Sequence, residues 1–152
     1  AQAPGENPMQ VVATLESRIV QIRTGRKGET VGYGAAEKLT RDTKIAILAT
    51  GYADGYHRAA SGTGVAVREA VSKGAEVSIE GHKAPLLGRV SMDMIAVDVT
   101  DVPPAILETA KWAELFGKHI ALDDLARACG TIGYELLTSI SPRTAVTYLP
   151  VG

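Results

Sequence analysis

The sequence contains a single cysteine, Cys129, among 152 residues. One cysteine excludes an internal disulfide and a zinc cluster held by several thiolates, and it fits a reducing compartment. The three histidines, His57, His82 and His119, are far apart in the sequence, and none shows the spacing of metal ligands. We therefore expect no metal site in this protein.

Long apolar runs and an excess of one charge are also missing. No apolar run approaches the roughly 20 residues that span a bilayer, and the N-terminus lacks the charged and apolar regions of a signal peptide. The 16 basic and 17 acidic residues are interspersed, which leaves no electrostatic footprint for nucleic acid or an anionic membrane. We expect a cytoplasmic protein with a small or neutral partner, and neither nucleic acid nor membrane bound.

Sequence motifs of several enzyme classes are absent as well. The chain has no G-x-S-x-G motif, no P-loop and no dinucleotide-binding fingerprint. Its candidate glycines, Gly25, Gly28, Gly81 and Gly88, fall in predicted hairpins rather than at strand-to-helix turns. Nucleophilic and nucleotide chemistry are therefore unsupported.

The composition predicts one folded domain. Hydrophobic residues make up 45% of the chain and charged residues 22%, which is ordinary for a globular protein of this length. Residues 1–10 include Pro4 and Pro8 and have no periodicity, so we interpret them as the remnant of an interdomain linker. Residues 11–152 are interpreted as a single β domain.

Short strands separated by glycine turns dominate the pattern. Residues 11–23 alternate but change phase, which predicts a long strand with a bulge near Ile19. After a predicted hairpin turn at residues 80–83, residues 84–99 predict a long return strand with Gly88 as a bulge or a point of close approach. Residues 65–72 fit a strand or a short helix equally well. The remaining predicted strands are residues 29–34, 44–50, 75–79, 112–116 and 144–149.

One stretch has a clear helical pattern. In residues 122–129, Leu122, Leu125, Ala126 and Cys129 lie on one face, and Gly130 can end the helix. A second short helix is predicted near residues 132–137. Taken together, the pattern predicts a mainly β fold, a barrel or a sandwich, with one or two short helices between Leu122 and Leu137.

The first candidate site follows the apolar strand at residues 44–50. Residues 51–58, GYADGYHR, gather Tyr52, Tyr56, His57 and Arg58 in one short loop, and loops on a rigid scaffold often carry function. Tyr52 has mechanistic potential because a phenol acts as a general base when cations or hydrogen bonds lower its pKa from about 10. By itself, the stretch also fits an ordinary tyrosine-rich turn.

The second candidate is residues 88–94, GRVSMDM. Arg89 can clamp a carboxylate or phosphate, although an arginine in a long strand is more often a solvated side chain. Asp93 is expected to lie on the same strand face and to be a partner for Arg89. Met92 and Met94 are most simply core fillers, but a methionine can also serve a site through its backbone N–H.

Together, these two motifs resemble the C-terminal β domain of alanine racemases. Further similarity at residues 14–18, 31–35, 120–126 and 130–135 extends the resemblance over nearly the whole chain. The resemblance implies an alanine racemase C-terminal type of β barrel or sandwich. It also implies a full enzyme with an N-terminal (β/α)₈ barrel, absent from this chain, whose lysine holds pyridoxal phosphate. In the implied head-to-tail homodimer, the β domain of one subunit completes the active site on the barrel of the other.

The resemblance also implies roles for individual residues. Tyr52 matches the catalytic tyrosine that exchanges the α-proton of L-alanine, and Met92 matches the position whose backbone N–H meets the substrate carboxylate. Tyr56, Arg89 and Asp93 would belong to the entrance region for the substrate. No cofactor-binding residue is expected in this chain.

One segment departs from the family pattern. Members often place a tyrosine near the start of the last strand, where it reaches the cofactor phosphate. This chain has Ser141, Pro142, Arg143 and Thr144 there, so phosphate binding is expected to be left to the barrel.

The expected function is thus the C-terminal domain of a racemase that converts L-alanine to D-alanine for peptidoglycan precursors, inactive without its barrel. The β domain of a related pyridoxal-phosphate amino-acid decarboxylase is one alternative. Those domains usually carry a cysteine ahead of an Asp-Gly pair in the site loop, whereas Cys129 lies in the predicted helix. The other alternative is a non-catalytic β module that binds a partner protein.

Overall fold

The structure is a computed structural model that describes residues 11–63 and 74–150. The linker expected at residues 1–10 lies outside the described residues, as does the segment 65–72 that fitted either a strand or a helix. In the described part of the chain, no helix is long and apolar enough to cross a membrane.

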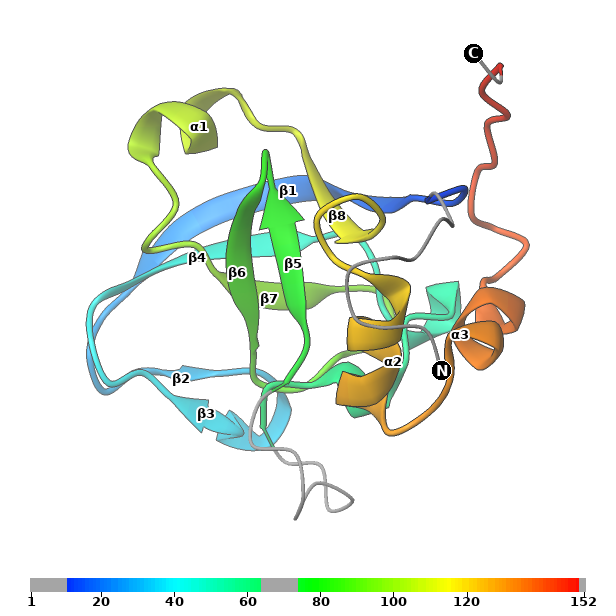
Figure 1. The fold of residues 1–152 in the computed structure, drawn as a ribbon. Helices are drawn as coiled ribbons and strands as arrows, with labels where there is room; N and C mark the ends of the chain where they lie inside the picture. Colours follow the sequence, from blue (N-terminus) through cyan, green and yellow to red (C-terminus); the bar gives the residue numbers. More distant parts are fainter. Residues whose placement is uncertain (1–10, 64–73, 151–152) are drawn as a thin grey trace, which may run out of the picture.

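Six antiparallel strands close into a barrel (Figure 1). Around the barrel the order is β1-β4-β7-β6-β5-β8, and β8 returns to pair with β1. The expected β fold is therefore confirmed as a barrel. The strands are β1 (Leu15–Gly25), β4 (Thr43–Leu48), β5 (Glu76–Ile79), β6 (His82–Leu87), β7 (Ile95–Asp98) and β8 (Trp112–Phe116).

The long strand β1 closes the barrel. Its first half pairs with β8 and its second half with β4, and the register with β4 shifts between Ile19 and Gln21. This irregularity confirms the bulge expected near Ile19. A bulge bends a strand and increases its twist, which allows one long strand to serve two neighbours.

Strand β4 is buried on both faces, which explains its nearly continuous apolar sequence. Ala46 and Leu48 face the main hydrophobic core inside the barrel. Ile45 packs in a second, smaller cluster with Val31, Leu39 and Leu87. This smaller cluster lies beneath a two-stranded flap formed by β2 (Thr30–Val31) and β3 (Glu37–Lys38).

The flap corrects one sequence expectation. Residues 29–34 were expected to form a strand, but only Thr30–Val31 does so, and the chain then makes a 3-10 turn, η1, at Tyr33–Ala35. The physical reason is the backbone at Gly32, whose positive φ of 85° takes it out of the β region.

The expected long strand over residues 84–99 is also wrong as a single element. The structure has two strands, β6 and β7, which pair with each other in antiparallel fashion, and residues 88–94 form the loop between them. Gly88 begins this loop with a φ of 65°, and a side chain there would crowd the Val31 carbonyl oxygen. The close approach expected at Gly88 is therefore confirmed, but its effect is to reverse the chain.

Three short helices pack outside the barrel (Figure 1). α2 (Leu122–Cys129) has the expected bounds and ends at Gly130, and α3 (Gly133–Ser139) is close to the expected second helix. α1 (Pro104–Thr109) was not predicted from the sequence, although Pro103 and Pro104 mark its start. Proline is well suited to the first turn of a helix, where its missing N–H costs nothing.

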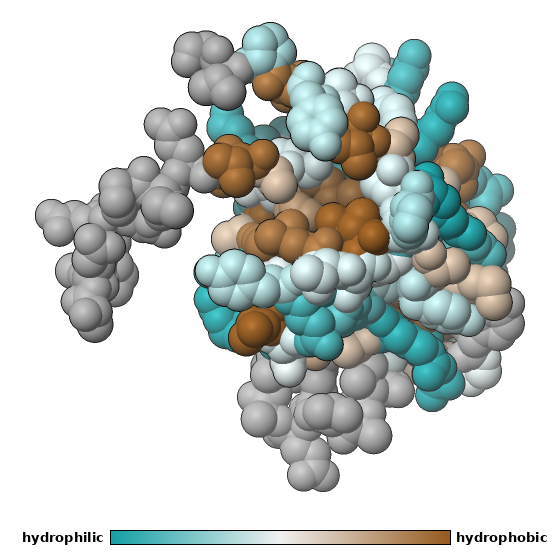
Figure 2. All heavy atoms as spheres, turned by 90° about the vertical axis from the view of Figure 1, so that its right-hand side faces the viewer, coloured by the Kyte–Doolittle hydropathy of each residue, from teal (hydrophilic) through white to brown (hydrophobic). Residues whose placement is uncertain are grey.

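The strand expected at residues 144–149 is wrong, because none of these residues is in a strand. Pairing of β1 with β8 has already closed the barrel, so the barrel has no open edge for a further strand. The side chains of Val146, Tyr148 and Leu149 are exposed instead. Apolar side chains gather on the face that carries α3 and this C-terminal segment (Figure 2).

The barrel core and the C-terminal segment should respond differently to truncation. Leu115→Ala removes a fully buried side chain of β8 and should lower the free energy of unfolding by about 2–5 kcal/mol. Val146→Ala should change it by less than about 0.5 kcal/mol, because Val146 is exposed and outside any strand. Urea unfolding followed by circular dichroism measures both values. A large loss in Val146→Ala would contradict the absence of a strand there.

Candidate functional site

The two candidate motifs lie at the same rim of the barrel. Residues 51–58 follow β4, residues 88–94 precede β7, and Leu48 at the end of β4 pairs with Ile95 at the start of β7. Antiparallel neighbours place the end of one strand beside the start of the next, so the loops are adjacent. The sheet thus brings together two segments that are about 40 positions apart in the sequence.

Tyr52 begins a short 3-10 turn, η2 (Tyr52–Asp54), that its own aspartate closes. The Asp54 N–H donates to the Gly51 carbonyl at 3.0 Å, and the Gly51 N–H donates to the Asp54 carboxylate at 2.9 Å. Asp54 thereby fixes the backbone beneath the tyrosine, as aspartate often does in turns. The side chain of Tyr52 remains 45% exposed at the rim.

Backbone hydrogen bonds join the Tyr52 turn to the loop at residues 88–94. The Tyr52 N–H donates to the Ser91 carbonyl and the Ala53 N–H to the Met92 carbonyl, both at 3.0 Å. A side chain at Gly51 would overlap these same two carbonyl groups, so the contact requires glycine there. The sequence did not predict this contact, although it singled out both partners.

The loop at residues 88–94 is held in shape at both ends. The Val90 N–H donates to the buried Ser61 hydroxyl at 2.9 Å, and the Ser91 hydroxyl donates to the Met94 carbonyl at 2.6 Å. The side chains of Met92 and Met94 are 53% and 51% exposed. The expectation that they fill the core is therefore wrong, because the loop leaves the sheet at this point.

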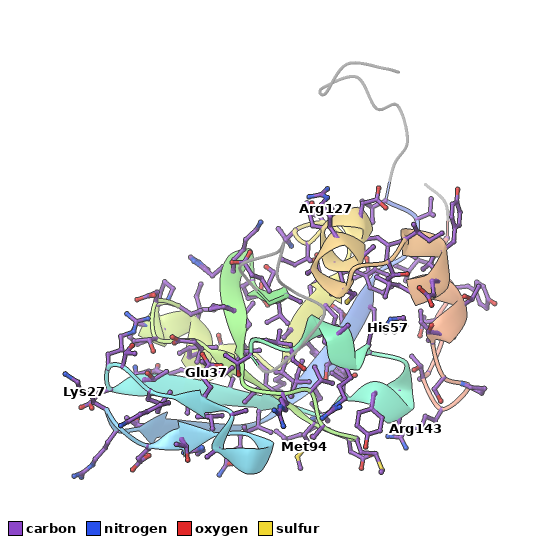
Figure 3. The ribbon with its side chains drawn as sticks, turned by 90° about the horizontal axis from the view of Figure 1, so that it is seen from below. Lys27, Glu37, His57, Met94, Arg127 and Arg143 are labelled. Carbon is purple, nitrogen blue, oxygen red and sulfur yellow. The ribbon has the colours of Figure 1, made fainter. Side chains whose placement is uncertain are left out.

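Arg143 connects the two motifs from a third segment. Its Nε donates to Asp54 at 2.6 Å and its Nη2 donates to Asp93 at 2.7 Å. These two hydrogen bonds, the one to Asp54 first, raise the pKa of the Arg143 guanidinium and keep it positively charged. Figure 3 shows Arg143 and Met94 along one edge of the molecule.

This network corrects the expected partner of Asp93. Asp93 was expected to pair with Arg89 on a common strand face, but residues 88–94 are a loop, and Asp93 binds Arg143. Arg143 was not selected from the sequence as a site residue. One feature of the sequence could have pointed to Arg143. Each motif contains an aspartate, Asp54 or Asp93, and two carboxylates brought close together favour a cation between them.

The end of α3 and the residues after it contact the Tyr52 loop. The Ser141 N–H donates to the Asp54 carbonyl at 3.0 Å, and His57 Nε2 lies 2.8 Å from the Ser139 hydroxyl. A side chain at Gly55 would overlap the Ser139 carbonyl. His57 thus packs against the end of α3, and residues 139–143 form the third segment of the site.

Arg89 and Tyr56 take no part in the bridge formed by Arg143. Arg89 lines a cavity of about 470 Å³ together with Arg23 and Met94, and its buried Nε has no hydrogen-bond partner within residues 11–63 and 74–150. Tyr56 belongs to the main hydrophobic core and is 3% exposed. Its side chain therefore packs in the core below the Tyr52 turn. Its role at a substrate entrance stays a prediction.

Within the described residues, the network around Tyr52 offers no free cation for a phosphate cofactor. Arg143 is already bound to two carboxylates, and Pro142 has no N–H to donate. Neither the cavity nor the network around Tyr52 includes a lysine that could form a Schiff base, as far as the described chain extends. In the same residues, no cluster of three His, Cys, Asp or Glu could hold a metal.

Comparison with known proteins decides the family. The sequence model described as "Alanine racemase, C-terminal domain" matches residues 12–148. The chain belongs to this family. The match favours the alanine racemase resemblance over the decarboxylase and partner-binding alternatives.

Curated alanine racemases share this sequence over one part of their length. The alanine racemase of Rhizobium meliloti is 51% identical over 143 residues, which cover 94% of this chain and 38% of that protein. The biosynthetic alanine racemase of Agrobacterium fabrum is 48% identical, over 94% of this chain and 37% of that protein. The chain thus spans less than two fifths of the length of these relatives.

Solved alanine racemase structures share the fold. The enzyme from Bartonella henselae, with covalently bound pyridoxal phosphate, matches with a TM-score of 0.80 and 31% identity, over 96% of this chain and 37% of that one. The biosynthetic enzyme from Pseudomonas aeruginosa gives 0.73 and 41%, over 86% and 33%. The alanine racemase type of β barrel is confirmed.

The glycine contact beneath Tyr52 gives a prediction. Gly51→Ala should lower the free energy of unfolding by about 1–3 kcal/mol, because the new methyl group overlaps backbone atoms that cannot move independently. It should also speed hydrogen exchange of the Tyr52 amide. Urea unfolding and NMR amide exchange measure the two effects.

Gly130→Ala provides the control for this substitution. Gly130 ends α2, and a side chain there meets nothing within 4 Å in the described structure. Its left-handed backbone should cost about 1 kcal/mol without affecting the Tyr52 amide. If the Tyr52 amide exchanged at the same rate in Gly51→Ala and Gly130→Ala, a specific contact at Gly51 would be contradicted.

Proposed function

We propose that this chain is the C-terminal β domain of a pyridoxal-phosphate-dependent alanine racemase, in which Tyr52 is the base on one face of the substrate. The supporting observation is the fixed Tyr52 turn, whose N–H groups bind the loop that contains Met92. That arrangement holds a half-exposed phenol at a barrel rim.

Racemisation requires a proton to leave one face of the α-carbon and another to arrive at the opposite face. In this proposal Tyr52 Oη takes the α-proton of L-alanine, or returns one to it in the reverse direction. A lysine on the N-terminal barrel serves the other face. When bound, pyridoxal phosphate delocalises the electron pair left by the broken C–H bond. The protein's contribution is the placement of both bases.

Met92 is proposed to bind the substrate carboxylate through its backbone. Its carbonyl accepts the Ala53 N–H, while its own N–H donates no hydrogen bond within the described residues. That N–H lies in the loop fixed against the Tyr52 turn, so the donor and the phenol are held in one unit. Such a donor can meet a carboxylate at a defined distance from the base.

The other base and the cofactor site are assigned to the rest of the protein. This chain spans 38% of the Rhizobium meliloti relative, and the cation of the Tyr52 network, Arg143, is already bound to two carboxylates. We propose that the exposed rim around Tyr52, Met92 and Met94 docks on the N-terminal (β/α)₈ barrel of the other subunit in a head-to-tail homodimer. Arg89 and Asp93, beside this rim, would line the substrate entrance.

The biological context follows from the proposed reaction. D-alanine would supply peptidoglycan precursors, and alanine would be the small-molecule partner. The cytoplasmic location expected from the sequence stays a prediction, as does the interpretation of residues 1–10 as an interdomain linker.

The 152-residue chain by itself should not racemise alanine. Incubated with pyridoxal phosphate and L-alanine, it should form no D-alanine, because it provides only one of the two bases. Chiral chromatography of the reaction mixture measures the product, with the full-length protein as the positive control. Turnover by the isolated chain would overturn the assignment of the second base to another part of the protein.

In the full-length protein, Tyr52→Phe removes the phenolic oxygen while keeping the ring. It should lower kcat by about 10²- to 10⁴-fold, as expected for the loss of a general base. Exchange of the α-proton with solvent, followed by NMR in D₂O, should be lost more completely for L-alanine than for D-alanine.

Tyr148→Phe is the matched control, because Tyr148 is also an exposed tyrosine but belongs to the C-terminal segment and not to η2. It should leave kcat and both exchange rates unchanged. Equal losses of exchange for L- and D-alanine in Tyr52→Phe would count against a base on each face.

A further inference from the structure

We propose that Arg143 is a positioning residue, which holds the Tyr52 turn against the Met92 loop by binding Asp54 and Asp93 together. The structural role of Arg143 follows from its two hydrogen bonds in this chain. Its effect on catalysis rests on the proposed function. Arg143 does not contact the reacting atoms in this proposal. It acts through the backbone of the two segments that do.

Each carboxylate that Arg143 binds is adjacent to a proposed site group. Asp54 ends the turn that Tyr52 begins, and Asp93 directly follows Met92. Asp54 binds the Gly51 N–H through Oδ2 and Arg143 through Oδ1, so both of its oxygens are used. Movement of the guanidinium would therefore be transmitted to both segments.

Charge makes this bridge more important than an isolated surface ion pair. Without the arginine, two carboxylates within reach of one guanidinium would repel each other, and this repulsion would weaken the contact between the Tyr52 turn and the Met92 loop. The Asp54 side chain is only 20% exposed, so water screens it less than the 52% exposed Arg143. An arginine fork can bind two carboxylates through different nitrogens, whereas a lysine offers a single point of charge.

The turn that contains Pro142 helps to build this bridge. The Thr144 N–H donates to the Ser141 carbonyl at 2.9 Å, which closes a turn around Pro142 and Arg143. Proline at the second position of a turn fixes φ in advance. The Ser141 N–H in turn binds the Asp54 carbonyl, so the turn that presents Arg143 is attached directly to η2.

The chain contains a matched control for Arg143. Arg41 also bridges two aspartates, Asp98 and Asp101, and it is 50% exposed. Its partners lie at the end of β7 and in the following turn, whereas the Tyr52 turn packs on the loop before β7. Arg41→Ala therefore removes a similar bridge without touching the site.

The first test uses the 152-residue chain, which contains the closed barrel and its core. Amide exchange of Tyr52 and Ala53, followed by NMR, should be about three- to tenfold faster in Arg143→Ala. The exchange rates in Arg143→Lys should lie between those of Arg143→Ala and those of the unchanged protein. In Arg41→Ala, both amides should exchange within about twofold of the unchanged rate. High salt should reduce the difference between Arg143→Ala and the unchanged protein.

Unchanged exchange in a folded Arg143→Ala protein would overturn the proposal. The same conclusion follows if Arg41→Ala speeds both amides equally, because the effect would then be general destabilisation. If Arg143→Ala does not fold, Arg143→Lys decides, since it keeps the charge and loses only the fork. Exchange at the unchanged rate in Arg143→Lys would then overturn the bridging role.

The second test uses the full-length protein. Arg143→Ala should lower kcat about tenfold, with α-proton exchange reduced more for L-alanine than for D-alanine, while Arg41→Ala changes neither. Faster amide exchange with an unchanged L-to-D ratio would support the positioning role and overturn Tyr52 as the base. Unchanged amide exchange overturns the positioning role whatever the kinetics show.

Discussion

The site depends on two backbone hydrogen bonds, from the Tyr52 and Ala53 N–H groups to the Ser91 and Met92 carbonyls. They require a residue without a side chain at Gly51, and they require neighbouring strands whose ends lie at the same rim. Pairing of β4 with β7 provides that adjacency. The barrel thus joins two loops that are distant in the sequence into one rigid unit. This unit presents the Tyr52 phenol together with the Met92 N–H, which has no partner among the described residues.

Closure of the barrel also determines where the C-terminal segment goes. Because β1 bends at its bulge and pairs with both β4 and β8, the sheet has no edge for a further strand. The chain after α3 therefore crosses the rim instead of joining the sheet, and its first residues reach the Tyr52 turn. The missing last strand and the arrival of Arg143 at the site have the same physical cause.

Electrostatics then complete the unit. Each of the two site loops carries an aspartate, and two carboxylates at one rim are unfavourable unless a cation lies between them. Arg143 is that cation, and its fork reaches both acids. Under the proposed function, small displacements of Tyr52 from the α-carbon of the substrate would be costly, so the rigidity of this rim would matter as much as the chemical nature of the phenol.

The sequence by itself determined the local elements and the identity of the site motifs. These features depend on residues that are close together in the chain, where periodicity and turn residues indicate the structure. They are the apolar run of β4, the helical face of α2, the bulge near Ile19 and the family resemblance around Tyr52. Only the tertiary structure decided that residues 88–94 form a loop, and that Arg143 binds acids 89 and 50 positions away. Such contacts depend on strand order and barrel closure, which no local pattern encodes.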